Sequence, residues 1–366
     1  MYFDHASTSP PSDSLNRSLY ELSLLSRYNP SSSHKEGLEL RKRLQRVRLQ
    51  VGKLIGAPED EIYFTSGATE ANNLALQGLC FNKKGHILSS AVEHASIEEA
   101  LVFLESRGFN VTRLDPKNLT NKEIVLDNLR EDTFMVSIMT VQNETGENYP
   151  LDGLGKALSK RGIIYHRDSV QAFGKIPVNV KAQGIDLASF SSHKLGGLKG
   201  LGILYCRKSL GIHPLFFGGG QEKGLRPGTE NTLGILALGK VLEERNLSSD
   251  YLYVKDINAR LRTGFEQLGG SLLSTPQASP YILAVSFPIP SEVLLTALSL
   301  KGVYVSAGSA CHANSGKEAR IVPFLENKEL GRGMLRFSIS TDTSLKEVED
   351  MLEILSATLK ELIRYL

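Results

Sequence analysis

The sequence predicts an α/β protein with a mainly parallel central sheet and a second, smaller α+β domain. Short β-branched runs alternate with helix-like stretches from about position 40 to 245, which is typical of a parallel sheet covered by helices. Several of these runs are apolar on both faces, as strands buried between helical layers are. After position 246 the pattern becomes helix, strand and helix, and it ends in an amphipathic stretch.

The expected strands are the runs in which β-branched and apolar residues are densest. They are Glu61–Phe64, His86–Ser89, Met135–Met139, Ile163–Arg167, Leu187–Ser189 and Gly202–Cys206. A helix is expected from Leu233 to Asn246, and the polar stretch Leu247–Tyr251 that follows indicates a domain boundary.

The composition excludes several broad classes of protein. The 366 residues are 41% hydrophobic and 22% charged, so collagen-like, low-complexity and largely disordered chains are excluded. The formal net charge is only +2 and the charges are scattered, which does not favour a nucleic-acid groove or a polybasic membrane patch. No apolar run reaches the ~18 residues that would span a bilayer, and the N-terminus has no secretory pattern. We expect a cytoplasmic globular protein.

Two common kinds of ligand site are not favoured. Gly234–Lys240 has the glycine and lysine spacing of a P-loop, but Val241 stands where a magnesium-binding Ser or Thr is needed, and the run lies inside a helical pattern. No GxGxxG sequence opens a helix after the first strand, so a dinucleotide fold is not favoured either.

The cysteines and histidines do not indicate a metal site or a disulfide framework. Cys80, Cys206 and Cys311 are far apart in the chain. His166 and Asp168 form a short His-x-Asp pair, but no third ligand stands at a recognisable spacing. We expect no metal.

Thr65–Glu70 is a small-residue turn between an expected strand and an expected helix. Such a turn presents free backbone N–H groups at a helix N-terminus, where a phosphate binds well. The alternative is an ordinary helix cap. From these residues alone both interpretations stay open.

Two further residues are candidates for chemistry at the ends of strands. Asp168 follows a buried strand, at the sheet edge where α/β proteins bind ligands. Lys194 follows a later strand among small residues, where a desolvated amine can form an imine. A lysine before glycines is more often simply solvated.

Cys311 stands beside His312 in a segment of small residues. A neighbouring positive group lowers the pKa of a thiol and makes it nucleophilic. A buried structural cysteine is the commoner case, so a reactive and a structural Cys311 are both kept as hypotheses.

Together, a phosphate cup, a strand-end aspartate, a lysine after a later strand and a cysteine fit one cofactor, pyridoxal phosphate. The chain resembles the NifS/IscS-type cysteine desulfurases of the class V aminotransferase family over nearly its whole length. The segments that carry the resemblance are Asn29–Ser32, Thr65–Glu70, Glu93–His94, Asn143–Gly146, His166–Gln171, Ser191–Lys194, Gly218–Asn231 and Ser306–Cys311.

The resemblance implies the fold of pyridoxal phosphate-dependent transferases of fold type I. A large cofactor-binding domain is expected at 15–246, and a small domain carrying the cysteine loop at 1–14 plus 247–366. Lys194 is then the residue that forms the internal Schiff base and later transfers a proton. Asp168 pairs with the pyridinium nitrogen, which keeps the ring electron-poor. His94 stacks on the ring as a catalytic residue, and Gln171 binds its phenolic oxygen.

The resemblance also assigns the phosphate ligands and the quaternary structure. The residues expected to hold the phosphate within one subunit are Ala68, Thr69, Ser191 and His193. Thr229 is expected to reach the phosphate of a second subunit, so the protein is expected to be a homodimer with shared active sites.

Substrate binding and sulfur transfer are assigned in the same way. Asn143 and Arg336 are expected to bind the carboxylate of L-cysteine, because arginine holds a carboxylate bidentately. Cys311 is expected to attack the substrate sulfur, which leaves a persulfide on the enzyme and L-alanine as product. The acceptor would be an Fe–S scaffold or another protein of tRNA or cofactor thiolation.

Other activities remain as alternatives. The first group is another class V enzyme: a selenocysteine lyase, an aminotransferase or a kynureninase-like hydrolase. The second is a sulfur carrier or assembly partner without turnover. The chain also departs from the family pattern, with Ser169 and Val170 in place of small alanines, Pro227 in place of Ser or Thr, and Ser340-Thr341 in place of Gly-Arg.

Overall fold

The structure is a computed structural model that describes residues 1–81, 83–307 and 319–364. The chain forms two compact units. The large unit consists of Pro10–Thr140 and Tyr149–Arg245. The small unit consists of Met1–Ser9, Val141–Asn148 and Asn246–Leu366.

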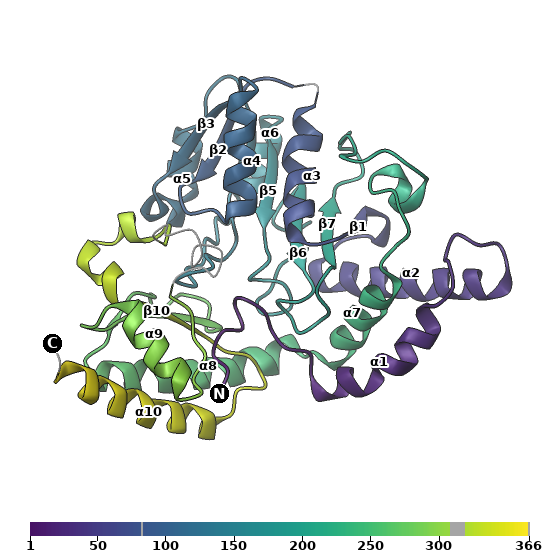
Figure 1. The fold of residues 1–366 in the computed structure, drawn as a ribbon. Coiled ribbons are helices and arrows are strands. Elements are labelled where there is room, and N and C mark those ends of the chain that lie inside the picture. Colours follow the sequence, from purple (N-terminus) through teal and green to yellow (C-terminus); the bar gives the residue numbers. More distant parts are fainter. Residues whose placement is uncertain (82, 308–318, 365–366) are drawn as a thin grey trace. The chain divides into compact units, whose positions relative to one another are not determined.

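The large unit is built on a seven-stranded sheet with the order β1-β7-β6-β5-β4-β2-β3 (Figure 1). Its strands are β1 (Ile62–Thr65), β2 (His86–Ser90), β3 (Asn110–Leu114), β4 (Thr133–Ser137), β5 (Ile164–Asp168), β6 (Leu187–Ser191) and β7 (Gly202–Cys206). The pairs from β3 to β6 are parallel, whereas β7 runs antiparallel to both of its neighbours. The predicted mainly parallel α/β fold is therefore confirmed.

The helices of the large unit are α1 (Asp13–Ser26), α2 (Lys35–Ile55), α3 (Ala68–Cys80), α4 (Ala95–Ser106), α5 (Lys122–Asp127), α6 (Leu154–Lys160) and α7 (Thr232–Glu244), with 3₁₀ turns at Glu59–Glu61 (η1), Pro116–Thr120 (η2) and Gln221–Gly224 (η3). The P-loop-like run Gly234–Lys240 lies inside α7, so it is not a phosphate loop.

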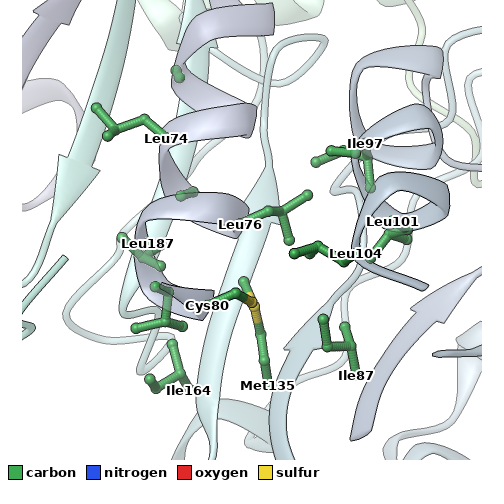
Figure 2. Packing of buried hydrophobic residues seen from close by; sticks show 14 of the residues in the cluster. Leu74, Leu76, Cys80, Ile87, Ile97, Leu101, Leu104, Met135, Ile164 and Leu187 are labelled. Carbon is green, nitrogen blue, oxygen red and sulfur yellow. The ribbon is translucent and has the colours of Figure 1, made fainter. Parts of the chain in front are cut away.

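The core beneath α3 and α4 is apolar and closely packed (Figure 2). Leu76 and Cys80 of α3 and Leu101 of α4 pack with Met135 of β4. Cys80 and Cys206 are buried free thiols, and burial raises the pKa of each to about 12. These two thiols therefore stay protonated and are structural.

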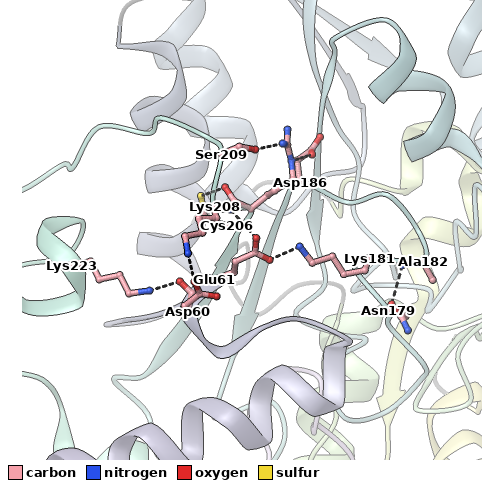
Figure 3. Close-up of polar contacts among 11 residues, drawn as sticks. Asp60, Glu61, Asn179, Lys181, Ala182, Asp186, Cys206, Lys208, Ser209 and Lys223 are labelled. Atoms are coloured by element: carbon pink, nitrogen blue, oxygen red, sulfur yellow. Dashed lines mark hydrogen bonds and ion pairs between the residues drawn. The ribbon is translucent and has the colours of Figure 1, made fainter.

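A polar cluster lies at the edge of the sheet where β1 and β6 begin (Figure 3). Glu61 is buried, pairs with Lys181 at 2.6 Å and accepts a hydrogen bond from the Lys208 main chain at 2.9 Å. The Lys208 ammonium binds Asp60 at 2.8 Å, and Asp186 accepts a hydrogen bond from the Tyr165 main chain at 2.9 Å. Asp186 also pairs with Arg207 at 2.6 Å, so each of the three carboxylates has a cationic partner, which indicates a structural role.

The small unit is built on a three-stranded antiparallel sheet with the order β10-β9-β8. Its elements are α8 (Leu247–Gln267), β8 (Ser271–Leu272), β9 (Ile282–Ser286), α9 (Ser291–Leu300), η4 (Val322–Phe324), η5 (Lys328–Gly333), β10 (Met334–Ser338) and α10 (Leu345–Ile363). Helices α8 and α9 both pack against α10 (Figure 1). The N-terminal segment joins this unit through isolated parallel bridges from Tyr2 to Tyr304 and from Asp4 to Ser338.

The expected boundary near Leu247–Tyr251 agrees with the division between the units, which falls between Arg245 and Asn246. The stretch itself is the first turn of α8, which the Asn246 side chain caps by accepting a hydrogen bond from Ser249 N. One detail differs from the sequence-based expectation. Val141–Asn148, expected in the large domain, belongs to the small unit. Its main chain binds that unit: Ser279 N donates to Gly146 O at 2.7 Å.

Candidate active site

The beginning of α3 is an open helix N-terminus at the end of β1. Gly67 is the N-cap residue, and no side chain caps the helix. Gly202 must remain glycine, because a Cβ there would lie 2.2 Å from the Gly67 carbonyl carbon. An uncapped helix N-terminus offers N–H donors and a favourable dipole to an anion. This geometry favours the phosphate interpretation of the turn over the ordinary cap.

Ser191 lies at the same edge of the sheet as this helix N-terminus. Thr65 of β1 and Ser191 of β6 both pair in register with Gly202 of β7, which lies between them. The Ser191 hydroxyl is buried, and it has no hydrogen-bond partner in the described part of the chain. Buried polar atoms nearly always have a partner. The Ser191 hydroxyl therefore fits a polar ligand bound at this edge.

His193 and Lys194 lie in the turn that follows β6. Burial, with further contributions from the charges of Lys194, Lys199 and Lys175, lowers the pKa of His193 to about 4. His193 is therefore neutral at pH 7 and can donate a hydrogen bond without bringing a positive charge.

Asp168 closes β5 at the same edge, because β5 and β6 run parallel and Asp168 pairs with Ser189. It is only 6% exposed. Its Oδ2 accepts a hydrogen bond from Asn72 Nδ2 at 2.8 Å, and its Oδ1 accepts one from Val170 N at 3.0 Å. The carboxylate is thus fixed in orientation by α3 and by its own turn.

His94 and Gln171 occupy the turns after β2 and β5. His94 is the N-cap of α4, and its Nδ1 accepts a hydrogen bond from Ser96 N at 3.1 Å. Gln171 is buried and accepts a hydrogen bond from Lys175 Nζ at 3.3 Å. The hydroxyl of Ser169, where the family has alanine, is buried and bonded to Thr140 Oγ1 at 2.7 Å.

Thr229 is exposed in the loop between η3 and α7. The loop is tied to α3 by the ion pair of Arg226 and Glu70, at 2.9 Å. Thr229 borders a cavity of about 130 Å³ that Thr65 and Ser66 also line.

In the small unit, Arg336 of β10 is only 2% exposed although it is charged. Its Nη1 donates to Asn143 O at 2.9 Å, and its Nη2 donates to Asp4 Oδ1 at 2.8 Å and to Ser7 Oγ at 2.7 Å. Its Nε has no partner in the described residues. The two residues predicted to bind the substrate carboxylate therefore lie in contact.

The predicted site residues thus divide between the units. Those in the large unit are Ala68, Thr69, His94, Asp168, Gln171, Ser191, His193, Lys194 and Thr229, and those in the small unit are Asn143 and Arg336. Cys311 lies outside the described residues. Among the described residues, no group of three or more His, Cys, Asp or Glu side chains could hold a metal ion. No described helix is long and apolar enough to cross a membrane.

Four residues that contact the predicted site residues were not predicted from the sequence. Asn72 and Ser96 contact Asp168 and His94, respectively, and Asp4 and Ser7 both contact Arg336. Asn72 gave a signal that could have been used, because it stands among apolar residues on the buried face of α3. The N-terminal contacts gave none, since they join residues more than 300 positions apart.

These features define a class of protein: an α/β enzyme fold with an uncapped helix N-terminus and a fixed aspartate at one sheet edge. The chain matches the family described as aminotransferase class-V over residues 1–351, and it belongs to that family.

Within the family, the similarity is to cysteine desulfurases, which confirms the resemblance found in the sequence. Cysteine desulfurase IscS of Dictyoglomus turgidum is 37% identical, over 99% of this chain and 95% of the relative. Putative cysteine desulfurase IscS 1 of Bacillus subtilis is 37% identical, over 95% of this chain and 96% of the relative.

Solved structures agree with this assignment. A NifS-like protein superposes with a TM-score of 0.87 at 31% identity, over 100% of both chains. The structure described as SspA in complex with cysteine gives a TM-score of 0.83 at 31% identity, over 94% of this chain and 99% of that one.

Proposed function

We propose that this protein is a pyridoxal phosphate-dependent cysteine desulfurase. It converts L-cysteine to L-alanine and transfers the sulfur to Cys311 as a persulfide. The observation that carries the proposal is the register of Thr65, Gly202 and Ser191, which sets the uncapped N-terminus of α3 beside an unpartnered buried hydroxyl.

The residues at this edge fit the cofactor. The first N–H groups of α3, including those of Ala68 and Thr69, would receive the phosphate together with Ser191 and His193. Asp168, whose carboxylate is held by Asn72 and by Val170 N, would pair with the pyridinium nitrogen. When bound, the cofactor supplies a sink for the electrons released at the substrate Cα.

The remaining roles belong to side chains of this protein. Lys194 would attach the cofactor and move the proton at the substrate Cα. His94 would lie over the ring, and Gln171 would donate to its phenolic oxygen. In the small unit, Arg336 and Asn143 would bind the substrate carboxylate and so orient the Cα–H bond.

The sulfur-transfer step balances without a further oxidant. The Cys311 thiolate attacks the substrate sulfur and forms an S–S bond, while the C–S bond of the substrate breaks. The electron pair of that bond stays on the substrate carbon, which takes a proton and becomes the methyl group of alanine. The nucleophile must be a thiolate for this step.

The quaternary structure and the acceptor belong to the same proposal. Thr229 would reach the phosphate of a second subunit, which makes the active enzyme a homodimer. The persulfide would pass to an Fe–S scaffold or to another sulfur acceptor in the cytoplasm.

The test is the visible spectrum of the purified protein before and after L-cysteine, with alanine and sulfide measured in the same sample. With a thiol reductant present to release the persulfide sulfur as sulfide, an imine band and equal amounts of alanine and sulfide are expected. In Cys311→Ala the band should stay and persulfide should be lost. The matched control is Cys206→Ala, which removes a buried protonated thiol and should keep the activity.

The rival functions give different results in this experiment. An aminotransferase would need a keto acid and would form no sulfide. A selenocysteine lyase would prefer selenocysteine over cysteine. A sulfur carrier without turnover would show neither the cofactor band nor alanine.

A further inference from the structure

A chain of hydrogen bonds joins Asp168 to His94 inside the large unit. Asn72 of α3 donates from Nδ2 to Asp168 Oδ2 at 2.8 Å and to Ser96 Oγ at 2.8 Å. Ser96 Oγ lies 2.9 Å from His94 Nδ1, and Ser96 N donates to the same ring nitrogen at 3.1 Å. The chain crosses from β5 through α3 to the first turn of α4.

The donors in this chain have a fixed direction. The Asn72 amide nitrogen carries two hydrogens, one for each of its partners. The Ser96 main-chain N–H can only donate, so His94 Nδ1 is an acceptor. The Ser96 hydroxyl accepts from Asn72 and is left to donate its own proton to Nδ1. Neutral His94 therefore carries its proton on Nε2.

If folding stability were the only requirement, asparagine would be an unfavourable residue at position 72. It is fully buried, and its Oδ1 has no partner in the part of the chain that the structure describes. Its neighbours one turn further along α3 are buried and apolar, namely Ala75 and Leu76. An apolar residue there would avoid the penalty of an unsatisfied oxygen. The position of Asn72 is explained by the groups that it orients.

We propose that Asn72 and Ser96 are positioning residues for the desulfurase reaction. They hold the Asp168 carboxylate in place and set the Nε2–H tautomer of His94. The proposal rests on the proposed function, in which Asp168 would pair with the pyridinium nitrogen and His94 would lie over the ring of the same cofactor. Residues that hydrogen-bond to a functional histidine in this way fix its tautomer and its ring orientation.

The first test reads the tautomer directly, without any turnover. Nitrogen-15 NMR of the holoenzyme labelled at histidine should show Nδ1 of His94 unprotonated and Nε2 protonated. The variant His94→Gln assigns the signal among the 8 histidines. In Ser96→Ala the main-chain N–H still donates to Nδ1, so the tautomer should stay while loss of the hydroxyl bond shifts the Nδ1 signal. In Ser96→Thr, which keeps the hydroxyl, the wild-type shift should return.

The second test separates positioning from substrate binding. In Asn72→Ala, kcat should fall about 10- to 100-fold, as for other partners that orient functional groups. KM for L-cysteine should change less than about 3-fold, because the proposed carboxylate ligands lie in the small unit. The matched control is Gln77→Ala, one turn further along α3, which is partly exposed and donates to Asn73 Oδ1 at 2.6 Å. It should leave both constants unchanged.

A protonated Nδ1 in the wild type would overturn the proposal, and so would an unchanged kcat in Asn72→Ala and Ser96→Ala. If Asn72→Ala does not fold, the wild-type tautomer and the Ser96 variants still decide. An enzyme that has the expected tautomer but forms no alanine would contradict the proposed function and leave the hydrogen-bond chain intact.

Discussion

Arg336 Nη1 donates a hydrogen bond to the main-chain oxygen of Asn143 at 2.9 Å. The contact joins β10 to the segment Val141–Asn148, which leaves the large unit and belongs to the small one. The same segment is held by Glu144, whose carboxylate accepts hydrogen bonds from Arg320 N at 3.3 Å and Ile321 N at 3.0 Å. The position of Asn143 is therefore set by the small unit and by Arg336 in particular.

We expect Arg336→Lys to raise KM for L-cysteine about 30- to 100-fold. Lysine lacks the planar fork that binds a carboxylate, and hydrogen bonds to charged groups are each worth ~1.5–3 kcal/mol. Steady-state kinetics with L-cysteine measure the effect. Arg332→Lys, at an exposed position of η5, is the matched control and should keep the wild-type KM. An unchanged KM in Arg336→Lys would show that the carboxylate binds elsewhere.

We expect Asp4→Asn to destabilise the protein by about 2 kcal/mol. Asp4 Oδ1 accepts from Arg336 Nη2 at 2.8 Å, and the arginine is almost fully buried. Loss of the carboxylate charge leaves the Arg336 charge uncompensated, although the amide oxygen of asparagine still accepts a hydrogen bond. Urea unfolding measures the change. Asp350→Asn, on the exposed side of α10, should differ from the wild type by less than about 0.5 kcal/mol.

The sequence predicted the central strands well, because their apolar runs are a local signal. Strand β3 was missed. It lies at the edge of the sheet, where only Leu114 of its five residues is buried, so it lacks the apolar run of a central strand. The placement of Val141–Asn148 was also missed, because it depends on hydrogen bonds to residues more than 100 positions away, such as Ser279.

The candidate site was predicted at the level of residue types and strand ends. Asp168 was expected at the end of a buried strand and lies there. The residues that orient it were missed: Asn72 is marked as a polar residue among apolar ones, but its partner lies 96 positions away and the sequence does not show which residue it contacts. Resemblance to a family identifies the site residues that stand in the family's motifs. The hydrogen bonds that orient those residues can be found only in the three-dimensional structure. The roles of the site residues stay predictions.

We expect Arg48→Met to destabilise the protein by about 3 kcal/mol. Arg48 holds Glu222 by two hydrogen bonds of 2.7 and 2.8 Å, and the Glu222 side chain is only 3% exposed. Glu222 also has a φ of 45°, a conformation that residues other than glycine rarely adopt. Removal of the arginine leaves a buried carboxylate without its partner.

Urea unfolding again provides the measurement for Arg48→Met. The matched control is Arg43→Met on the same helix, where Arg43 pairs with Glu39 at 3.6 Å and both side chains are more than a third exposed. Exposed pairs of this kind contribute about 0.5 kcal/mol or less. If the two variants lost equal stability, the inference that Arg48 stabilises the turn containing Glu222 would be wrong.

Glu93 should make stability depend on pH in a direction unusual for a carboxyl group. It is fully buried, and burial raises its pKa to about 8 against the opposing hydrogen bonds from Ser90 Oγ at 2.5 Å and Met139 N at 2.8 Å. Between its ordinary pKa of 4.5 and about 8, the folded protein holds a proton that the unfolded chain has lost. The free energy of unfolding therefore falls as pH rises through this window.

The variant Glu93→Gln cannot ionise and should lack this dependence. Relative to the variant, the wild type should lose up to about 4 kcal/mol between pH 5 and pH 8, since each pKa unit corresponds to ~1.4 kcal/mol. Urea unfolding at pH 5, 6.5 and 8 gives the comparison. For Glu131→Gln, at an exposed position of the same unit, the free energy of unfolding should depend on pH as it does in the wild type. If the free energies of unfolding of Glu93→Gln and the wild type changed equally with pH, Glu93 would be ionised in the folded protein. Its Oε2, which has no partner among the described residues, would then need one from outside them.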